Sequence, residues 1–117
     1  MNDKEIAGRF LARSKHMVVA VTLEDGTPWG VPVRITRQEG RVFEWDSKPE
    51  AVHSQAIARN EAISLVVFSV DDDIGVYAKA VAAELPNSGN GTGQRRYRAT
   101  VTEAWLNEQH VKRPIVL

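Results

Sequence analysis

Residues 43–68, FEWDSKPEAVHSQAIARNEAISLVVF, contain an aromatic strand, a short helix and an apolar strand in direct succession. Within this stretch residues 47–50, SKPE, have the form of a capping box, with Ser47 as the N-cap and Glu50 three residues later. The box predicts a helix over about 49–60. The apolar run that follows predicts a strand over 62–70 that is buried on both faces.

The start of this helix is a candidate anion site. Its first backbone N–H groups lack partners within the helix, and the helix dipole makes this end positive. The side chains around it can bind a phosphate: Ser47, Lys48, His53 and Ser54. The pattern favours a phosphate clamp. The same residues are also explained if Ser47 only caps the helix while His53 and Ser54 face solvent.

Alternating apolar residues and turn signals predict a mainly β fold with two helices. A first helix over 3–13 can be capped by Asp3. Strands are predicted over 17–23, 31–35, 42–45, 62–70, 75–85 and 94–105. Pro28 and Pro32 indicate that the second strand lies at a sheet edge or pairs irregularly, because proline cannot donate to a ladder. This order predicts a single domain over residues 1–117, a six-stranded antiparallel barrel with two short flanking helices.

Composition narrows the classes of function. Fifteen basic and fifteen acidic residues cancel, so we expect no binding to nucleic acid or anionic membranes. The chain has no cysteine, and its three histidines are scattered, so no metal site is expected. No catalytic triad is recognisable, and redox chemistry would need a bound cofactor. The charged residues 1–5 are not typical of a signal peptide, and a cytoplasmic location is expected.

A small basic cluster, Arg95, Arg96 and Arg98, flanks Tyr97 on the last predicted strand. These arginines are explained either as the solvent face of the strand or as contacts to an acidic ligand. The preceding glycines, at 89, 91 and 93, stand before a strand rather than a helix, so they do not indicate a dinucleotide-binding turn.

Several segments together resemble the pyridoxamine 5′-phosphate oxidase-like, FMN-binding split-barrel family. Residues 24–33, EDGTPWGVPV, resemble its "dG-x-P-x-x-x-P-v" strand pair. Trp45-Asp46-Ser47, followed by His53-Ser54-x-x-Ile57-x-x-Asn60, resembles its phosphate-binding helix. Residues 63–68, 75–82 and 97–105 resemble the strands that follow, so the similarity covers about residues 5–106.

The resemblance implies a split barrel that binds FMN at the interface of a homodimer. Carried over by position, the isoalloxazine would lie beside Val31, Pro32, Val33 and Arg34. The ribityl chain would be flanked by Trp45, Asp46 and Ser47, and the phosphate would be held by His53 and Ser54. Many members carry a lysine or arginine where this chain has Val52 and His53, and pyridoxamine phosphate oxidases have a longer arginine-rich C-terminal region. We therefore expect no vitamin B6 oxidation.

The function expected from these observations is that of an FMN-dependent oxidoreductase acting on an unknown small-molecule substrate. No residue stands out as an acid or base catalyst, although Arg34 could stabilise negative charge near a reduced ring if it faces inward. Three alternatives remain on the same fold: a deazaflavin (F420)-dependent reductase that uses the basic cluster, a non-catalytic flavin- or haem-binding module, and a barrel without cofactor. We expect the dimer contact to include Tyr77, Tyr97 and Trp105.

Overall fold

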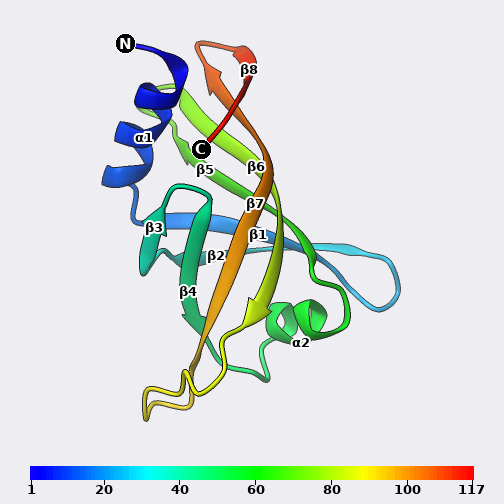
Figure 1. Ribbon diagram of the computed structural model, residues 1–117. Coiled ribbons are helices and arrows are strands. Elements are labelled where there is room, and N and C mark those ends of the chain that lie inside the picture. The colour runs from blue at the N-terminus through cyan, green and yellow to red at the C-terminus, as the bar shows by residue number, and fades with distance from the viewer.

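The computed structural model describes all residues, 1–117, and consists of eight strands and two helices (Figure 1). In chain order the elements are α1 (Asp3–Arg13), β1 (His16–Thr22), β2 (Pro28–Arg34), β3 (Arg37–Glu39), β4 (Val42–Ser47), α2 (Val52–Arg59), β5 (Ala62–Ser69), β6 (Ile74–Glu84), β7 (Arg95–Glu108) and β8 (Val111–Ile115).

All strands pair antiparallel in one sheet, with the order β2-β1-β5-β6-β7-β4-β3. The long strand β7 pairs with β6 on one side, and on its other side with β4 near its start and β8 near its end. The sheet curls until β2 lies close to β4, but these two strands do not pair. This opening makes the structure a split barrel, which confirms the fold class predicted from the sequence.

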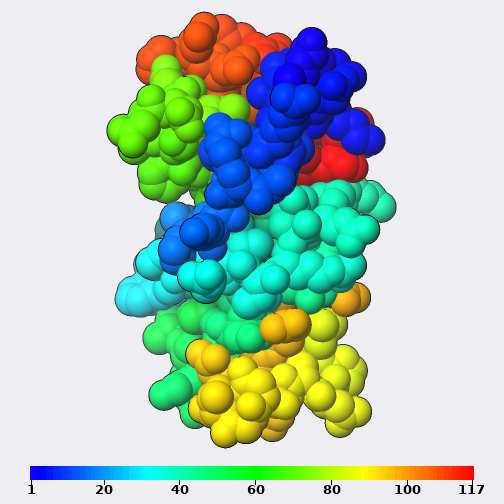
Figure 2. All heavy atoms as spheres, turned by 90° about the vertical axis from the view of Figure 1, so that its left-hand side faces the viewer, coloured from blue at the N-terminus to red at the C-terminus, as the bar shows by residue number.

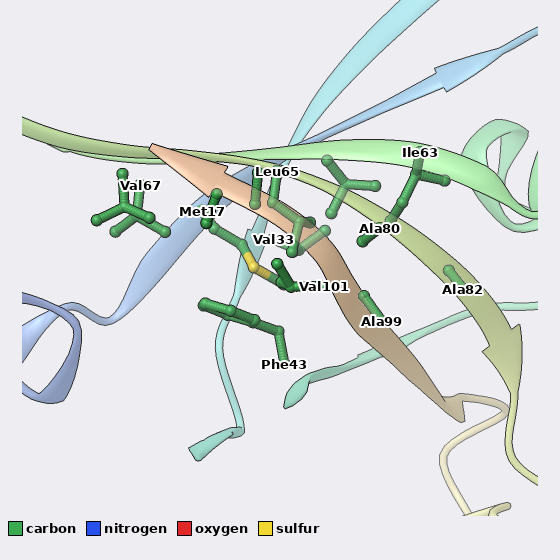
Figure 3. Packing of buried hydrophobic residues seen from close by; sticks show 14 of the residues in the cluster. Met17, Val33, Phe43, Ile63, Leu65, Val67, Ala80, Ala82, Ala99 and Val101 are labelled. Carbon is green, nitrogen blue, oxygen red and sulfur yellow. The ribbon is translucent and has the colours of Figure 1, made fainter. Parts of the chain in front are cut away.

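The core fills the concave side of the sheet. Alternate residues of each strand point into it, so that Met17, Phe43 and Val101, from three different strands, pack together (Figure 3). Helix α2 adds Ala56 and Ile57 beside β1 and β6. Figure 2 shows α1 lying above the β3–β4 hairpin, with the connection between β6 and β7 at the opposite end. The core is continuous from one helix to the other.

Two strands were not predicted, β3 and β8. Strand β3 is only Arg-Gln-Glu and carries no apolar alternation. Strand β8 follows a two-residue turn in which Gln109 and His110 both have positive φ, 50° and 66°. That geometry fits a tight hairpin turn, for which Asn or Gly is usual. Because Gln109 and His110 are not typical turn residues, the sequence did not predict this hairpin.

The predicted caps of both helices are wrong. Asn2, not Asp3, caps α1 by accepting the N–H of Glu5 at 2.9 Å, while Asp3 forms an ion pair with Arg113. Helix α2 begins at Val52, and its N-cap has no side-chain hydrogen bond. Ser47 instead ends β4, five positions before the helix. The capping box therefore does not form, because the chain needs the intervening residues to leave the sheet.

Strand β5 is buried on one face only, contrary to the sequence-based prediction. Ile63, Leu65 and Val67 point into the core, whereas Phe68 on the opposite face is 58% exposed. No second layer covers the convex side of the sheet. Neither helix is long and apolar enough to cross a membrane.

Candidate functional site

Strand β4 divides the predicted site between the two faces of the sheet. Trp45 and Ser47 point inward, whereas Asp46 points outward and forms a bidentate ion pair with Arg96, at 2.9 and 3.1 Å. Trp45 is 0% exposed and its ring stacks on that of Tyr97, with the centroids 5.8 Å apart. The indole Nε1 of Trp45 is buried without a hydrogen-bond partner. Trp45 therefore packs in the core against Tyr97 and does not line an open cleft.

Ser47 and His53 form a buried pair. The Oγ of Ser47 lies 2.9 Å from Nε2 of His53, and the histidine is 8% exposed. Burial lowers the pKa of His53 below its ordinary value, because desolvation disfavours the charged imidazolium. The histidine is consequently neutral at pH 7. It orients Ser47, and it contributes no positive charge to an anion site.

The start of α2 retains the properties expected of an anion site. No side chain caps it, and the protein offers no hydrogen-bond partner to the backbone N–H groups of Val52, His53 and Ser54. Lys48 is exposed in the segment that leads into the helix, and it forms no ion pair. Free N–H groups at the positive end of a helix dipole, together with a nearby ammonium group, suit a phosphate.

The side chain of Ser54 does not join the Ser47–His53 pair. It lines a pocket of about 520 Å³ whose wall also includes Tyr97 and Glu84. Ser54 is 3% exposed and its Oγ has no hydrogen-bond partner. Tyr97 donates a hydrogen bond to the carboxylate of Glu84 at 3.1 Å. Burial raises the pKa of the Tyr97 phenol, so it stays protonated at neutral pH.

The predicted flavin contacts on β2 are also split by the alternation of the strand. Val33 is buried and Val31 half-buried on the core side, whereas Pro32 and Arg34 are exposed on the other side. Arg34 thus faces outward, contrary to the orientation required for a role inside the barrel. As the prolines predicted, β2 is an edge strand, and it lies close to both β4 and α2.

The arginines of the basic cluster on β7 are mostly engaged in ion pairs. Arg98 binds the Glu44 carboxylate at 2.7 Å, and Arg37 binds the same carboxylate at 3.2 Å. Arg96 is bound to Asp46 as described. Only Arg95 has no acidic partner, and its guanidinium packs against the loop at Gly89. Two of the three arginines therefore neutralise carboxylates of β4.

Two further expectations concern Tyr97 and metals. Tyr97 is 3% exposed and points into the core, so the prediction that it forms part of a subunit contact is wrong. Its alternation with Ala99 and Val101 along β7 was the signal for this inward orientation. Histidine and acidic side chains form no group of three that could hold a metal ion.

No protein-family model matches the sequence, and no curated protein matches it. Solved structures do match. A Clostridium acetobutylicum protein related to general stress protein 26, of the pyridoxinephosphate oxidase family, has a TM-score of 0.85 and 12% identity, over 100% of this chain and 97% of that one. This chain therefore has the split-barrel fold of that protein, which confirms the resemblance at the level of fold.

Two other matches carry different names. A protein named F420 reductase has a TM-score of 0.70 and 14% identity, covering 82% of this chain and 93% of its own. A haem-binding protein from Mycobacterium smegmatis has a TM-score of 0.82 and 14% identity, over 99% of this chain and 58% of that one. The names of the matched structures thus span more than one cofactor class.

Proposed function

We propose that the chain binds FMN and acts as an oxidoreductase of the pyridoxamine 5′-phosphate oxidase-like type. The uncapped start of α2 carries this proposal, because three backbone N–H groups converge there beside Lys48. The same end of the barrel holds β2 and β4, from which the flavin contacts were predicted. The donors present fit a phosphate, although the clamp uses backbone groups rather than a charged histidine.

In this proposal the N–H groups of residues 52–54 and the ammonium of Lys48 hold the phosphate. His53 holds Ser47 in place through its 2.9 Å contact, and Ser47 flanks the ribityl chain. Pro32 and Arg34 lie beside the ring system from the exposed side of β2. The bound flavin would supply hydride or electron transfer, while the protein supplies orientation and electrostatics.

We further propose that the protein is a homodimer whose second copy completes the site. Cross-strand pairing places an apolar row on the convex side of the sheet, comprising Pro32, Val18, Val66, Tyr77, Trp105 and Pro114. The row spans six strands and includes Pro32, one of the predicted flavin contacts. An apolar surface this continuous favours association with a second copy. We also propose that the protein is cytoplasmic.

The alternatives are less well supported by the site. An F420-dependent reductase would need cations for an acidic tail, yet Arg96 and Arg98 are bound to Asp46 and Glu44. A haem module would need an axial ligand, and Nε2 of His53 is already paired with Ser47. FMN remains the cofactor that the geometry favours.

Titration of FMN and riboflavin, followed by flavin fluorescence, tests the proposal. We expect FMN to bind at least about tenfold more tightly, which corresponds to roughly 1.4 kcal/mol for the phosphate contacts. Lys48→Ala should reduce this preference, whereas Lys4→Ala, on the exposed side of α1, should leave it unchanged. Equal affinities for the two flavins would contradict a phosphate clamp. Tight binding of haemin or F420 without FMN binding would favour the corresponding alternative.

A further inference from the structure

The pocket beside α2 shares one residue with the proposed flavin contacts, Ser54, which faces the pocket with its side chain, whereas the phosphate would use its backbone N–H. It lies between the helix, the end of β6 and the start of β7. In Figure 1 the helix itself is at the lower right. Its volume is about 520 Å³, within the usual range of small-molecule sites. Its walls include none of Ser47, Lys48 and His53, and no residue of β2. The side chains that line the pocket are therefore unused by the function proposed above.

The floor of this pocket carries a polar group with an unmet hydrogen-bonding need. Ser54 Oγ is buried and has no hydrogen-bond partner. The hydroxyl lies near the phenol of Tyr97 and influences its pKa, but the geometry between them is not that of a hydrogen bond. A ligand atom in the pocket could satisfy Ser54.

Next to Ser54 the floor is rigid. Tyr97 is held by stacking on Trp45 and by its hydrogen bond to Glu84. Because its O–H is given to Glu84, the phenol oxygen can still accept a hydrogen bond from a ligand. Tyr97 and Glu84 thus present acceptors side by side in a fixed geometry.

The charges of the lining favour a ligand that donates hydrogen bonds. Glu61 and Glu84 line the pocket and neither has a cationic partner, whereas Arg59 is the one basic side chain in the lining. The remaining walls are largely apolar, with Ile57, Ala58, Ala82 and Ala83 among them. An apolar pocket with an excess of carboxylates suits a cation on an apolar body.

We propose that this pocket is a binding site for a small amphipathic amine. The ammonium group is received by Glu84, Glu61 and the hydroxyl of Ser54, which accepts a hydrogen bond from it, and the apolar body lies against the alanines of β6 and the helix. The site is distinct from that of the flavin, so both ligands bind at the same time.

Titration of the ¹⁵N-labelled full chain with 2-phenylethylamine tests this site by NMR. 2-Phenylethanol and 3-phenylpropionate are the matched neutral and anionic probes. We expect the amine to shift the amide signals of Ala58, Ala83 and Tyr97 together, and to bind at least threefold more tightly than the alcohol. The acid should not bind. Equal binding of all three probes, or shifts scattered over the surface, would refute the proposal.

Three variants separate binding from folding. Ala58→Trp fills the pocket from an exposed helix position and should abolish binding, whereas Ala12→Trp on the exposed side of α1 should not. Ser54→Ala should weaken amine binding at least threefold without lowering the melting temperature, since its hydroxyl has no partner in the folded protein. Unchanged amine affinity in both Ala58→Trp and Ser54→Ala would overturn the assignment.

A competition experiment distinguishes this site from the flavin site. Saturating FMN should leave the affinity for 2-phenylethylamine unchanged, and Ala58→Trp should leave FMN binding unchanged. Displacement of the amine by FMN would show that the pocket is part of the flavin site and would overturn the separate-site proposal. If FMN does not bind at all, the amine result still stands, because the pocket lining shares no side chain with the proposed phosphate contacts.

Discussion

At the scale of single residues, burial changes what a side chain can do chemically. His53 suits a phosphate by its residue type, but in the folded protein its imidazole is neutral and engaged with Ser47. Glu44 points to the outer face of the sheet, between the core residues Phe43 and Trp45 of β4. It is still buried there, because Arg37 and Arg98 pair with its carboxylate. The sequence shows which side chains are present. Ser47 and His53 are close in sequence, whereas Arg98 lies 54 positions from Glu44.

His53 should make the protein less stable in mild acid. The unfolded chain takes up a proton on this histidine as the pH falls through about 6.5, whereas the folded protein resists because burial lowers the pKa. The unfolded state then binds more protons, so the free energy of unfolding falls as pH is lowered from 6.5 toward the folded pKa. Urea unfolding at several pH values measures this slope.

His53→Gln, which can keep a hydrogen bond to Ser47, should reduce the slope between about pH 7 and 5.5. His16→Gln is the control, because the side chain of His16 is exposed to solvent. The prediction would be contradicted if the wild-type protein became more stable as the pH is lowered from 7 to 5.5 and His53→Gln removed this gain. The folded state would then bind a proton at His53 more readily than the unfolded chain.

At the scale of elements, helix starts depend on how the chain leaves the sheet. The SKPE sequence has the right spacing for a capping box, yet β4 continues through Ser47 and pairs it with Arg95 of β7. The segment after it needs further residues to turn, so α2 begins at Val52 without a side-chain cap. By contrast, Asn2 is free of any strand and caps α1 directly.

The two helix starts should therefore respond differently to substitution. Asn2→Ala should lower the free energy of unfolding by about 1 kcal/mol, because Glu5 loses its N-cap partner. Glu50→Ala should change it by less than about 0.5 kcal/mol, since its side chain makes no capping contact. Urea denaturation of both variants measures the difference. Equal losses would show that the capping box forms in solution.

At the scale of the whole molecule, the convex side of the sheet is incomplete. The row from Pro32 to Pro114 crosses six strands, and Phe68 is exposed near it. Lys79 and Lys112 lie over the ring of Trp105, at 5.8 and 5.7 Å from its centroid. The sheet has one packed face and one bare face, and a second copy would cover the bare one.

FMN binding and dimerisation should be linked. Because the proposed site is completed by the partner, FMN should stabilise the dimer, and dilution should release flavin together with subunits. Sedimentation over a wide concentration range, followed at the flavin band, measures both. Val66→Lys should produce a monomer with weakened FMN binding, and Val116→Lys, near the C-terminus, should do neither. A monomer that keeps its flavin would contradict the shared site.

Local features of the chain account for much of the architecture. Period-two alternation indicated one buried face for β2 and β7, and the prolines of β2 indicated an edge or irregular pairing. Gly26 and Gly40, with φ of 86° and 55°, mark turns that were recognisable because other residues rarely adopt this conformation. These features are set by neighbours in sequence, so the sequence contains their physical cause.

The candidate site could be predicted only as a set of residue types. Whether Ser47 caps a helix or bonds His53 depends on where β4 stops pairing with β7. Whether Arg96 and Arg98 are free depends on the register that aligns them with Asp46 and Glu44. The pocket at Ser54 exists because α2 packs beside the end of β6. Each of these outcomes rests on contacts between distant segments, which form only when the sheet curls into its final shape.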